Sequence, residues 1–139
     1  PQLRQKCGDR AVLRAVHFYQ ENARVPKQVA ALEQGDFETF LKLIKESGYS
    51  SYMYLQNVIP AGYKEYQDVA LALAMCEHYL QGKGAYRVHG GGFAGTVQAF
   101  VPFEILEDFR SSMDAVLGKG ACHVLSIRPQ GGVPAVPAD

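Results

Sequence analysis

The chain has 139 residues, 47% of them hydrophobic, which is enough to bury the core of one ordered domain over residues 1–139. Fourteen basic and fourteen acidic residues cancel, and no stretch interleaves basic with aromatic side chains, which argues against a nucleic-acid partner. The sequence has no apolar run of membrane-spanning length and no basic-then-apolar leader. These features predict one ordered globular domain with no membrane partner.

The three cysteines favour reduced thiols. Cys7, Cys76 and Cys122 are an odd number, lie far apart and form no Cys-x-x-Cys pair. A zinc site or a disulfide framework is therefore not expected, and reduced thiols fit a cytosolic protein. Cys76 and Cys122 are expected to pack as small buried hydrophobic residues.

The segment 14–20 follows two periodicities at once. Val16 and Tyr19 fit helical spacing, whereas the aromatic and β-branched content of the segment is typical of a strand. We interpret residues 14–20 as a strand. A helix is then expected from Pro26, which suits a first helical turn, to Gly35, which suits a helix end.

Two amphipathic helices are expected next. Asp36 is a suitable N-cap for a helix that continues, with a kink near Gly48, until Val58-Ile59-Pro60 ends it. Residues 63–81 form the second helix, followed by glycines. The residues expected to face the core are Phe37, Phe40, Leu41 and Ile44 in the first helix and Val69, Leu73, Cys76 and Leu80 in the second.

After residue 84 the spacing of apolar residues changes to every second residue, which is typical of strands. Tyr86 and Val88 indicate one strand, and residues 96–101 indicate another in which Val97, Ala99 and Val101 share a face. A helix from Phe103 to Gly118 follows, with Ile105 or Leu106, Phe109, Met113 and Val116 on its inner face. His123, Leu125 and Ile127 alternate in an expected last strand, and residues 129–139 are expected to be a flexible tail.

The expected order is therefore strand, helices, strand, strand, helix, strand. This order is that of the split βαβ, or ferredoxin-like, arrangement: an α+β fold with an antiparallel sheet and helices on one face. The first crossover is unusually long and helical.

A glycine run separates the two central strands. Arg87 to Thr96 contains Gly90, Gly91, Gly92 and Gly95, and such a cluster indicates a tight turn or backbone lying against a bulky group. Backbone N–H groups in such a turn can also bind an anion. The run is neither a Walker loop nor a dinucleotide-binding fingerprint, because no Gly-Lys-Ser/Thr and no helix follows it.

Groups for catalysis are scarce. The histidines at 17 and 123 fit structural roles on strands, His78 fits a helix surface, and His89 borders the glycine run. The carboxylates form no pair suited to general acid and base chemistry. Ser47, Ser50 and Ser51 lack the strand–elbow–helix context of an activated serine. We therefore expect neither a metal site nor a catalytic residue within residues 1–139.

Three segments resemble the galactokinase branch of the GHMP small-molecule kinases. Gly90-Gly91-Gly92-Phe93-Ala94-Gly95-Thr96 resembles the C-terminal glycine-rich motif of that family. Arg14-Ala15-Val16-His17 with Glu21-Asn22-Ala23-Arg24-Val25 resembles its Arg-Ala-x-His…Glu-Asn-x-Arg-Val segment. Gly35-Asp36-Phe37, with Leu43, Glu46 and Ser47 after it, resembles its Gly-Asp-Phe…Leu-Met-x-Glu-Ser helix, and all three occur in the family's order and spacing.

The resemblance implies a GHMP-kinase C-terminal domain, taken from a longer chain whose N-terminal half carries the sugar, phosphate and catalytic motifs. The whole enzyme would be a cytoplasmic, monomeric kinase that transfers the γ-phosphate of ATP, with Mg²⁺, to the anomeric hydroxyl of galactose. Its own N-terminal lobe would be the partner of this chain, which alone would be inactive and bind no cofactor tightly. Gly90, Gly91, Gly92, Phe93 and Gly95 would form one wall of the cleft for ATP and substrate.

Two departures from the family pattern leave other readings open. Ala94 replaces a glycine and would be strained at positive φ. Residues 47–60, with their tyrosines, do not follow the family pattern, so the substrate can differ from galactose. The alternatives are a GHMP kinase with another substrate and a non-catalytic ligand-sensing or interaction module.

Overall fold

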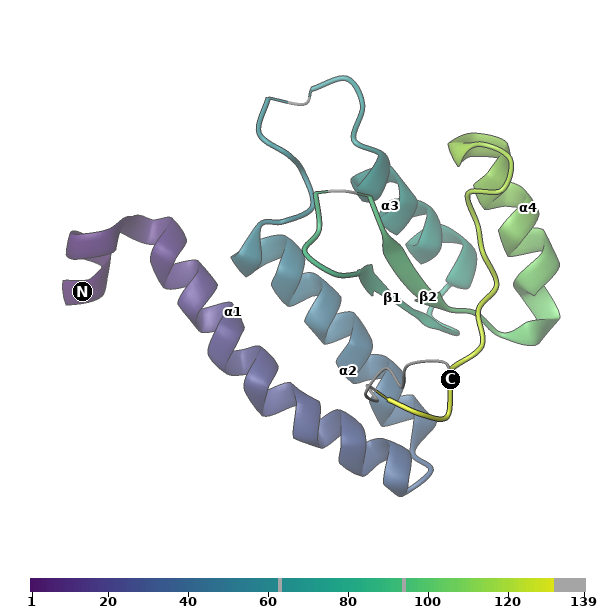
Figure 1. Ribbon diagram of the computed structural model, residues 1–139, viewed down its shortest axis with the longest axis horizontal. Helices are drawn as coiled ribbons and strands as arrows, with labels where there is room; N and C mark the ends of the chain where they lie inside the picture. The colour runs from purple at the N-terminus through teal and green to yellow at the C-terminus, as the bar shows by residue number, and fades with distance from the viewer. Residues whose placement is uncertain (63, 94, 132–139) are drawn as a thin grey trace, which may run out of the picture.

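The computed structural model describes residues 1–62, 64–93 and 95–131 and shows an α+β architecture. The described residues form four α-helices, two short helical segments and a two-stranded antiparallel sheet (Figure 1). The elements in chain order are α1 (Gln2–Glu33), α2 (Phe37–Ser50), the π-helix η1 (Ser51–Leu55), α3 (Asp68–Leu80), β1 (Ala85–Val88), β2 (Val97–Phe100), the 3-10 helix η2 (Phe103–Ile105) and α4 (Leu106–Leu117).

The sheet lies between two pairs of helices (Figure 1). β1 pairs with β2 so that Tyr86 opposes Ala99 and Val88 opposes Val97. These four side chains share one face of the sheet, which packs against α3 and α4. Phe100, on the opposite face, contacts Phe40 of α2 in an edge-to-face arrangement with ring centroids 5.5 Å apart.

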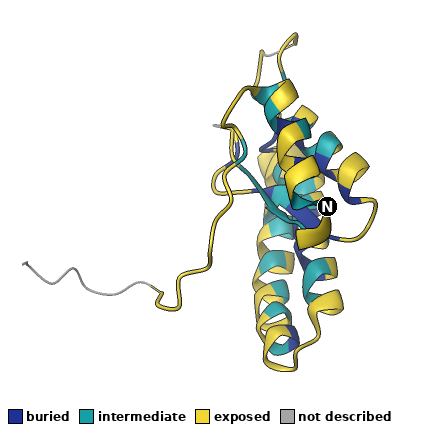
Figure 2. Ribbon diagram, turned by 90° about the vertical axis from the view of Figure 1, so that its right-hand side faces the viewer, coloured by how far each residue is buried: buried dark blue, intermediate teal, exposed yellow. Residues whose placement is uncertain are grey.

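The core is concentrated between the sheet, α3 and α4, and the edges of the molecule are exposed (Figure 2). Its most buried members come from α3, β1 and α4, and Cys76 lies among them as expected, with Cys122 packed beside it. Burial raises the pKa of the Cys76 thiol to about 12, so this thiol stays protonated. The buried residues of the cluster are Ala72, Cys76, Leu80, Tyr86, Phe109 and Met113.

The expected strand over residues 14–20 is wrong, because this segment lies within α1. The inner face of α1 is polar: His17, Glu21, Arg24 and Gln28 recur at helical spacing and are partly buried. The helical spacing of Val16 and Tyr19 was the correct indication, whereas the aromatic and β-branched content of the segment was misleading. The same helix continues through Pro26, which was expected to begin a helix, and ends before Gly35.

The expected ferredoxin-like sheet is not present in the described residues, which form two strands. Residues 121–128 are extended but are not paired with a strand, and Leu125 and Ile127 are 86% and 89% exposed. Helices also contact both faces of the sheet rather than one, since Phe100 meets α2. Residues 129–131 are exposed and without secondary structure, and the rest of the expected tail, 132–139, lies outside the described residues.

The other predicted elements are confirmed with shifted ends. Asp36 caps α2 by accepting the N–H of Thr39 at 3.0 Å, and the helix continues through η1 to Leu55. α3 begins at Asp68 rather than at residue 63, which lies outside the described residues, and Gly118 ends α4. The buried side of α2 agrees with expectation at Ile44 and differs elsewhere: Leu43, Ser47 and Ser50 also face inward, while Phe37 is exposed. On α4, Val116 is exposed.

Gly48 lets α2 approach β1 closely. A Cβ atom at this position would lie 3.0 Å from Arg87 Cβ and 3.0 Å from the Tyr86 carbonyl oxygen. The glycine that interrupts the apolar stripe of α2 therefore marks the contact between helix and strand. Over the described residues, no helix is both long and apolar enough to cross a bilayer.

Candidate functional site

The glycine run forms the loop that joins β1 to β2. His89 donates its backbone N–H to the Thr96 carbonyl at 2.8 Å, so the ladder extends one pair beyond the strands. Past this pair Gly90, Gly92 and Gly95 have positive φ angles, as does Phe93 at 48°. The described glycines therefore adopt backbone that favours glycine, and Ala94 lies outside the described residues.

Asn57 holds the loop from beneath. Its side-chain Nδ2 donates to the Gly91 carbonyl at 3.3 Å, and its backbone carbonyl accepts the Phe93 N–H at 2.8 Å. The two bonds flank Gly92, where a Cβ atom would lie 2.1 Å from the Asn57 carbonyl oxygen. Asn57 is 3% exposed and follows Gln56, whose left-handed conformation ends η1. Gly92 is therefore required both for its φ of 76° and for this close approach.

The outer side of the loop is open. A Cβ atom at Gly90, Gly91 or Gly95 would meet no other atom within 4 Å. Phe93 is 43% exposed. The five predicted site residues therefore divide into Gly92, which faces the protein, and the others, which present bare backbone and one aromatic ring to the surface.

A second polar cluster joins α1, α2 and β1 through the carboxylate of Glu21. Ser47, which is fully buried, donates its hydroxyl to Glu21 Oε1. Arg87 Nη1 of β1 lies 3.3 Å from the same oxygen, and Arg24 pairs with Oε2. Arg24 Nε also lies 3.9 Å from Glu46 Oε2. This carboxylate therefore has a partner on each of the elements that it faces.

His17 belongs to the same cluster. Its Nδ1 lies 2.9 Å from the hydroxyl of Ser50, which is 4% exposed. Burial lowers the pKa of His17, and the charges of Arg24 and Arg87 lower it further against the opposing effect of Glu21. The neutral imidazole is thus favoured, which fits the predicted structural role although His17 lies on a helix.

The other candidate side chains stay apart. His78, His89 and His123 are exposed, and no group of three or more His, Cys, Asp or Glu side chains in the described residues could hold a metal ion. The glycine loop and the Glu21 cluster touch the same strand, because Arg87 lies two residues before His89.

No pattern in the sequence indicated Asn57, and Glu46 was named only in the family resemblance. Glu21 and Arg24 were visible only through the resemblance, and Arg87 only as the start of the glycine run. The arrangement presents exposed glycine backbone and the aromatic ring of Phe93 to a bound molecule, beside the exposed His89. No known family model matches the chain, and no solved structure matches it significantly.

Proposed function

We propose that this chain is the C-terminal lobe of a galactokinase-like sugar kinase, which transfers the γ-phosphate of ATP to the anomeric hydroxyl of galactose. The observation that carries the proposal is the meeting of two of the three resembling segments at Glu21. This carboxylate belongs to the Glu-Asn-x-Arg-Val segment and binds Ser47 of the Glu-Ser segment. It also binds Arg87, which lies three residues before the resembling glycine motif. Segments defined by sequence likeness alone are thus joined by direct polar contacts.

In this proposal the glycine loop forms one wall of the active-site cleft. Its exposed backbone lets a phosphate loop or a substrate approach closely, and Asn57 fixes its position. Phosphoryl transfer depends mainly on positioning and on stabilising charge, so a rigid wall contributes to catalysis without a reactive side chain. The described residues offer no cluster of metal ligands, and the proposal therefore assigns Mg²⁺, the phosphate loop and the catalytic base to the N-terminal lobe.

The ferredoxin-like sheet belongs to the same proposal, with its missing strand supplied from outside the described residues. His89 and Thr96 form a hydrogen-bonded pair, so alternation along the ladder directs the peptide groups of Val97 and Ala99 away from β1. No described strand covers that edge of β2. A strand paired there would complete the sheet.

The test is a coupled phosphorylation assay on the chain extended by its upstream reading frame. We expect ATP-dependent phosphorylation of galactose by the extended protein and none by residues 1–139 alone. A panel of other sugars and small alcohols distinguishes a GHMP kinase with another substrate. An extended protein that phosphorylates no member of the panel, or residues 1–139 binding ATP tightly by calorimetry, would overturn the proposal and favour the non-catalytic module.

A further inference from the structure

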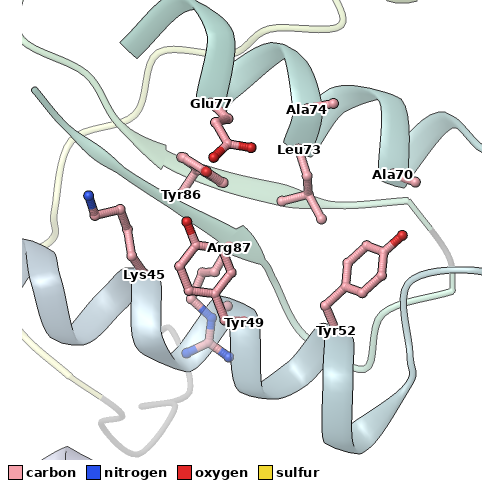
Figure 3. A pocket seen from close by; sticks show the side chains of 10 residues that line it. Lys45, Tyr49, Tyr52, Ala70, Leu73, Ala74, Glu77, Tyr86 and Arg87 are labelled. Carbon is pink, nitrogen blue, oxygen red and sulfur yellow. The ribbon is translucent and has the colours of Figure 1, made fainter. Parts of the chain in front are cut away.

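A cavity of about 230 Å³ lies between α2 and α3, above β1 (Figure 3). Arg87 lines this cavity and also binds Glu21. The residues of the glycine loop do not line it, and neither do Arg24 and Ser47, the other partners of Glu21. The lining residues are Lys45, Gly48 and Tyr49 of α2, Tyr52 of η1, Ala70, Leu73, Ala74 and Glu77 of α3, and Tyr86 and Arg87 of β1.

The cavity exists because large side chains on one helix face small ones on the other. Tyr49 and Tyr52 rise from the α2 side toward α3, which presents Ala70 and Ala74 (Figure 3). Alanine leaves the space that a larger residue would fill at the packing density of a protein interior. Tyr49 and Tyr52 are 53% and 45% exposed, so the cavity is open to a ligand from solution.

The polarity of the lining changes from one end to the other (Figure 3). Lys45 of α2 and Glu77 of α3 lie at the end near Tyr86, whereas Tyr52 and Ala70 lie at the opposite end. Leu73 lies between these ends on the α3 side. The cavity therefore offers one end with both charges and one apolar, aromatic end.

The polar end has uncommitted charges and neutral hydroxyl groups. Neither Lys45 nor Glu77 forms an ion pair with another described residue. Burial, a hydrogen bond with Tyr49 and the nearby Glu77 raise the pKa of Tyr86, so its phenol stays protonated at neutral pH. The Arg87 guanidinium points toward the far side of α2, where it binds Glu21.

We propose that this cavity binds a free α-amino acid with an aromatic or branched apolar side chain. Its carboxylate would meet the ammonium of Lys45 and its ammonium the carboxylate of Glu77, while its side chain lies between Tyr49, Leu73 and Tyr52. A zwitterion satisfies both charges of the polar end, which a simple amine or acid does not. A cavity of about 150 Å³ accommodates benzene, so one ring with a short polar head fits this volume.

The experiment is a titration of ¹⁵N-labelled protein with L-phenylalanine, followed by the amide resonances. We expect shifts at Tyr49, Ala74 and Glu77 and none in α4. Phenethylamine and 3-phenylpropionate, which each lack one charged group, should bind about tenfold more weakly, because each loses a charge-assisted hydrogen bond. L-Leucine should bind, and glycine, which has no side chain to fill the apolar end, should not.

Variants locate the site. Ala74→Phe fills the cavity and should abolish the shifts, and Lys45→Gln should remove the preference for phenylalanine over phenethylamine. Lys42→Gln, an exposed lysine of α2 outside the cavity, is the matched control and should bind as the unaltered chain does. The proposal is overturned if L-phenylalanine shifts none of the lining residues, if all three ring compounds bind equally, or if Ala74→Phe with an unchanged fold still binds. These outcomes are independent of kinase activity.

Discussion

Glu21 is the residue on which most of the polar architecture depends. Its carboxylate is bonded to Ser47, Arg24 and Arg87 and so connects two helices to the strand that enters the glycine loop. Ser47 is fully buried and contributes no apolar packing, so its place in α2 is explained by this bond. Within the proposed function, Glu21 is a positioning residue that fixes the strand beneath the loop.

The conformation of the loop leads to a prediction at Gly92. Gly92→Ala should lower the free energy of unfolding by about 2 kcal/mol, because positive φ is unfavourable for alanine and the new Cβ displaces the loop from Asn57. Chemical denaturation measures the loss, and amide exchange at residues 90–95 should accelerate. Gly91→Ala is the matched control: its Cβ meets nothing within 4 Å, so stability should change by less than about 0.5 kcal/mol. Equal effects of the two variants would contradict the role given to Asn57.

His17 leads to a prediction about pH. Its pKa is lowered in the folded protein, so below the ordinary value of 6.5 the unfolded chain binds the proton more readily than the folded chain does. This contribution to stability is fully present above pH 6.5 and is lost as the pH falls toward the folded pKa. Denaturation curves should therefore show His17→Asn to be less sensitive to pH in this range than the unaltered chain. His78→Asn, at an exposed site, is the control and should keep the original dependence.

At the scale of elements, the sequence revealed the helices that bury apolar stripes. Val69, Cys76 and Leu80 recur at helical spacing and are buried in α3, and the alternation of Val97 and Ala99 marks β2. The pattern of residues 14–20 in α1 was ambiguous, because Val16 and Tyr19 fit a helix while the aromatic and β-branched content favours a strand. The inward residues His17 and Glu21 are polar and bond to α2, so they added no apolar stripe.

The candidate site shows the same limit. Four glycines within six residues identify the loop. On either side of it the apolar residues alternate with a period of two, which identifies the strands. Asn57 lies 34 residues before Gly91, and no local pattern indicates that it will lie under the loop. Contacts between distant segments could be anticipated only where the family resemblance named both segments, as for Glu21 and Ser47.

The contact between α2 and β1 leads to a prediction at Gly48. Alanine favours a helix over glycine by about 1 kcal/mol, yet a Cβ 3.0 Å from Arg87 Cβ and the Tyr86 carbonyl overpacks the contact. We expect Gly48→Ala to lower the thermal midpoint, with a net destabilisation of about 1 kcal/mol. Lys42→Ala, on an exposed part of the same helix, should leave it unchanged. A higher midpoint for Gly48→Ala would show that the helix can move away from the strand at little cost.

For the whole molecule, two features remain without a partner in the described residues: an open edge of the sheet, and the exposed apolar side chains of the segment after α4. The free edge of β2 presents unpaired peptide groups, and Val124, Leu125 and Ile127 are 56%, 86% and 89% exposed. Asp114 anchors the start of this segment by accepting the N–H groups of Gly120 and Cys122, which lowers its pKa. An open strand edge of this kind can pair with another chain.

Residues 1–139 on their own should therefore self-associate through this edge, as a consequence of its lacking a partner strand. The double variant Leu125→Lys and Ile127→Lys should shift the population toward the monomer in sedimentation velocity, because it replaces two exposed apolar side chains with like charges. Both side chains are exposed, so the thermal midpoint extrapolated to low concentration should not fall. Phe103→Lys, 92% exposed but next to α4, controls for added charge alone and should leave association unchanged. A chain that stays monomeric at every concentration would show that the edge is protected without a partner. The proposal that a further strand completes the sheet would then be contradicted.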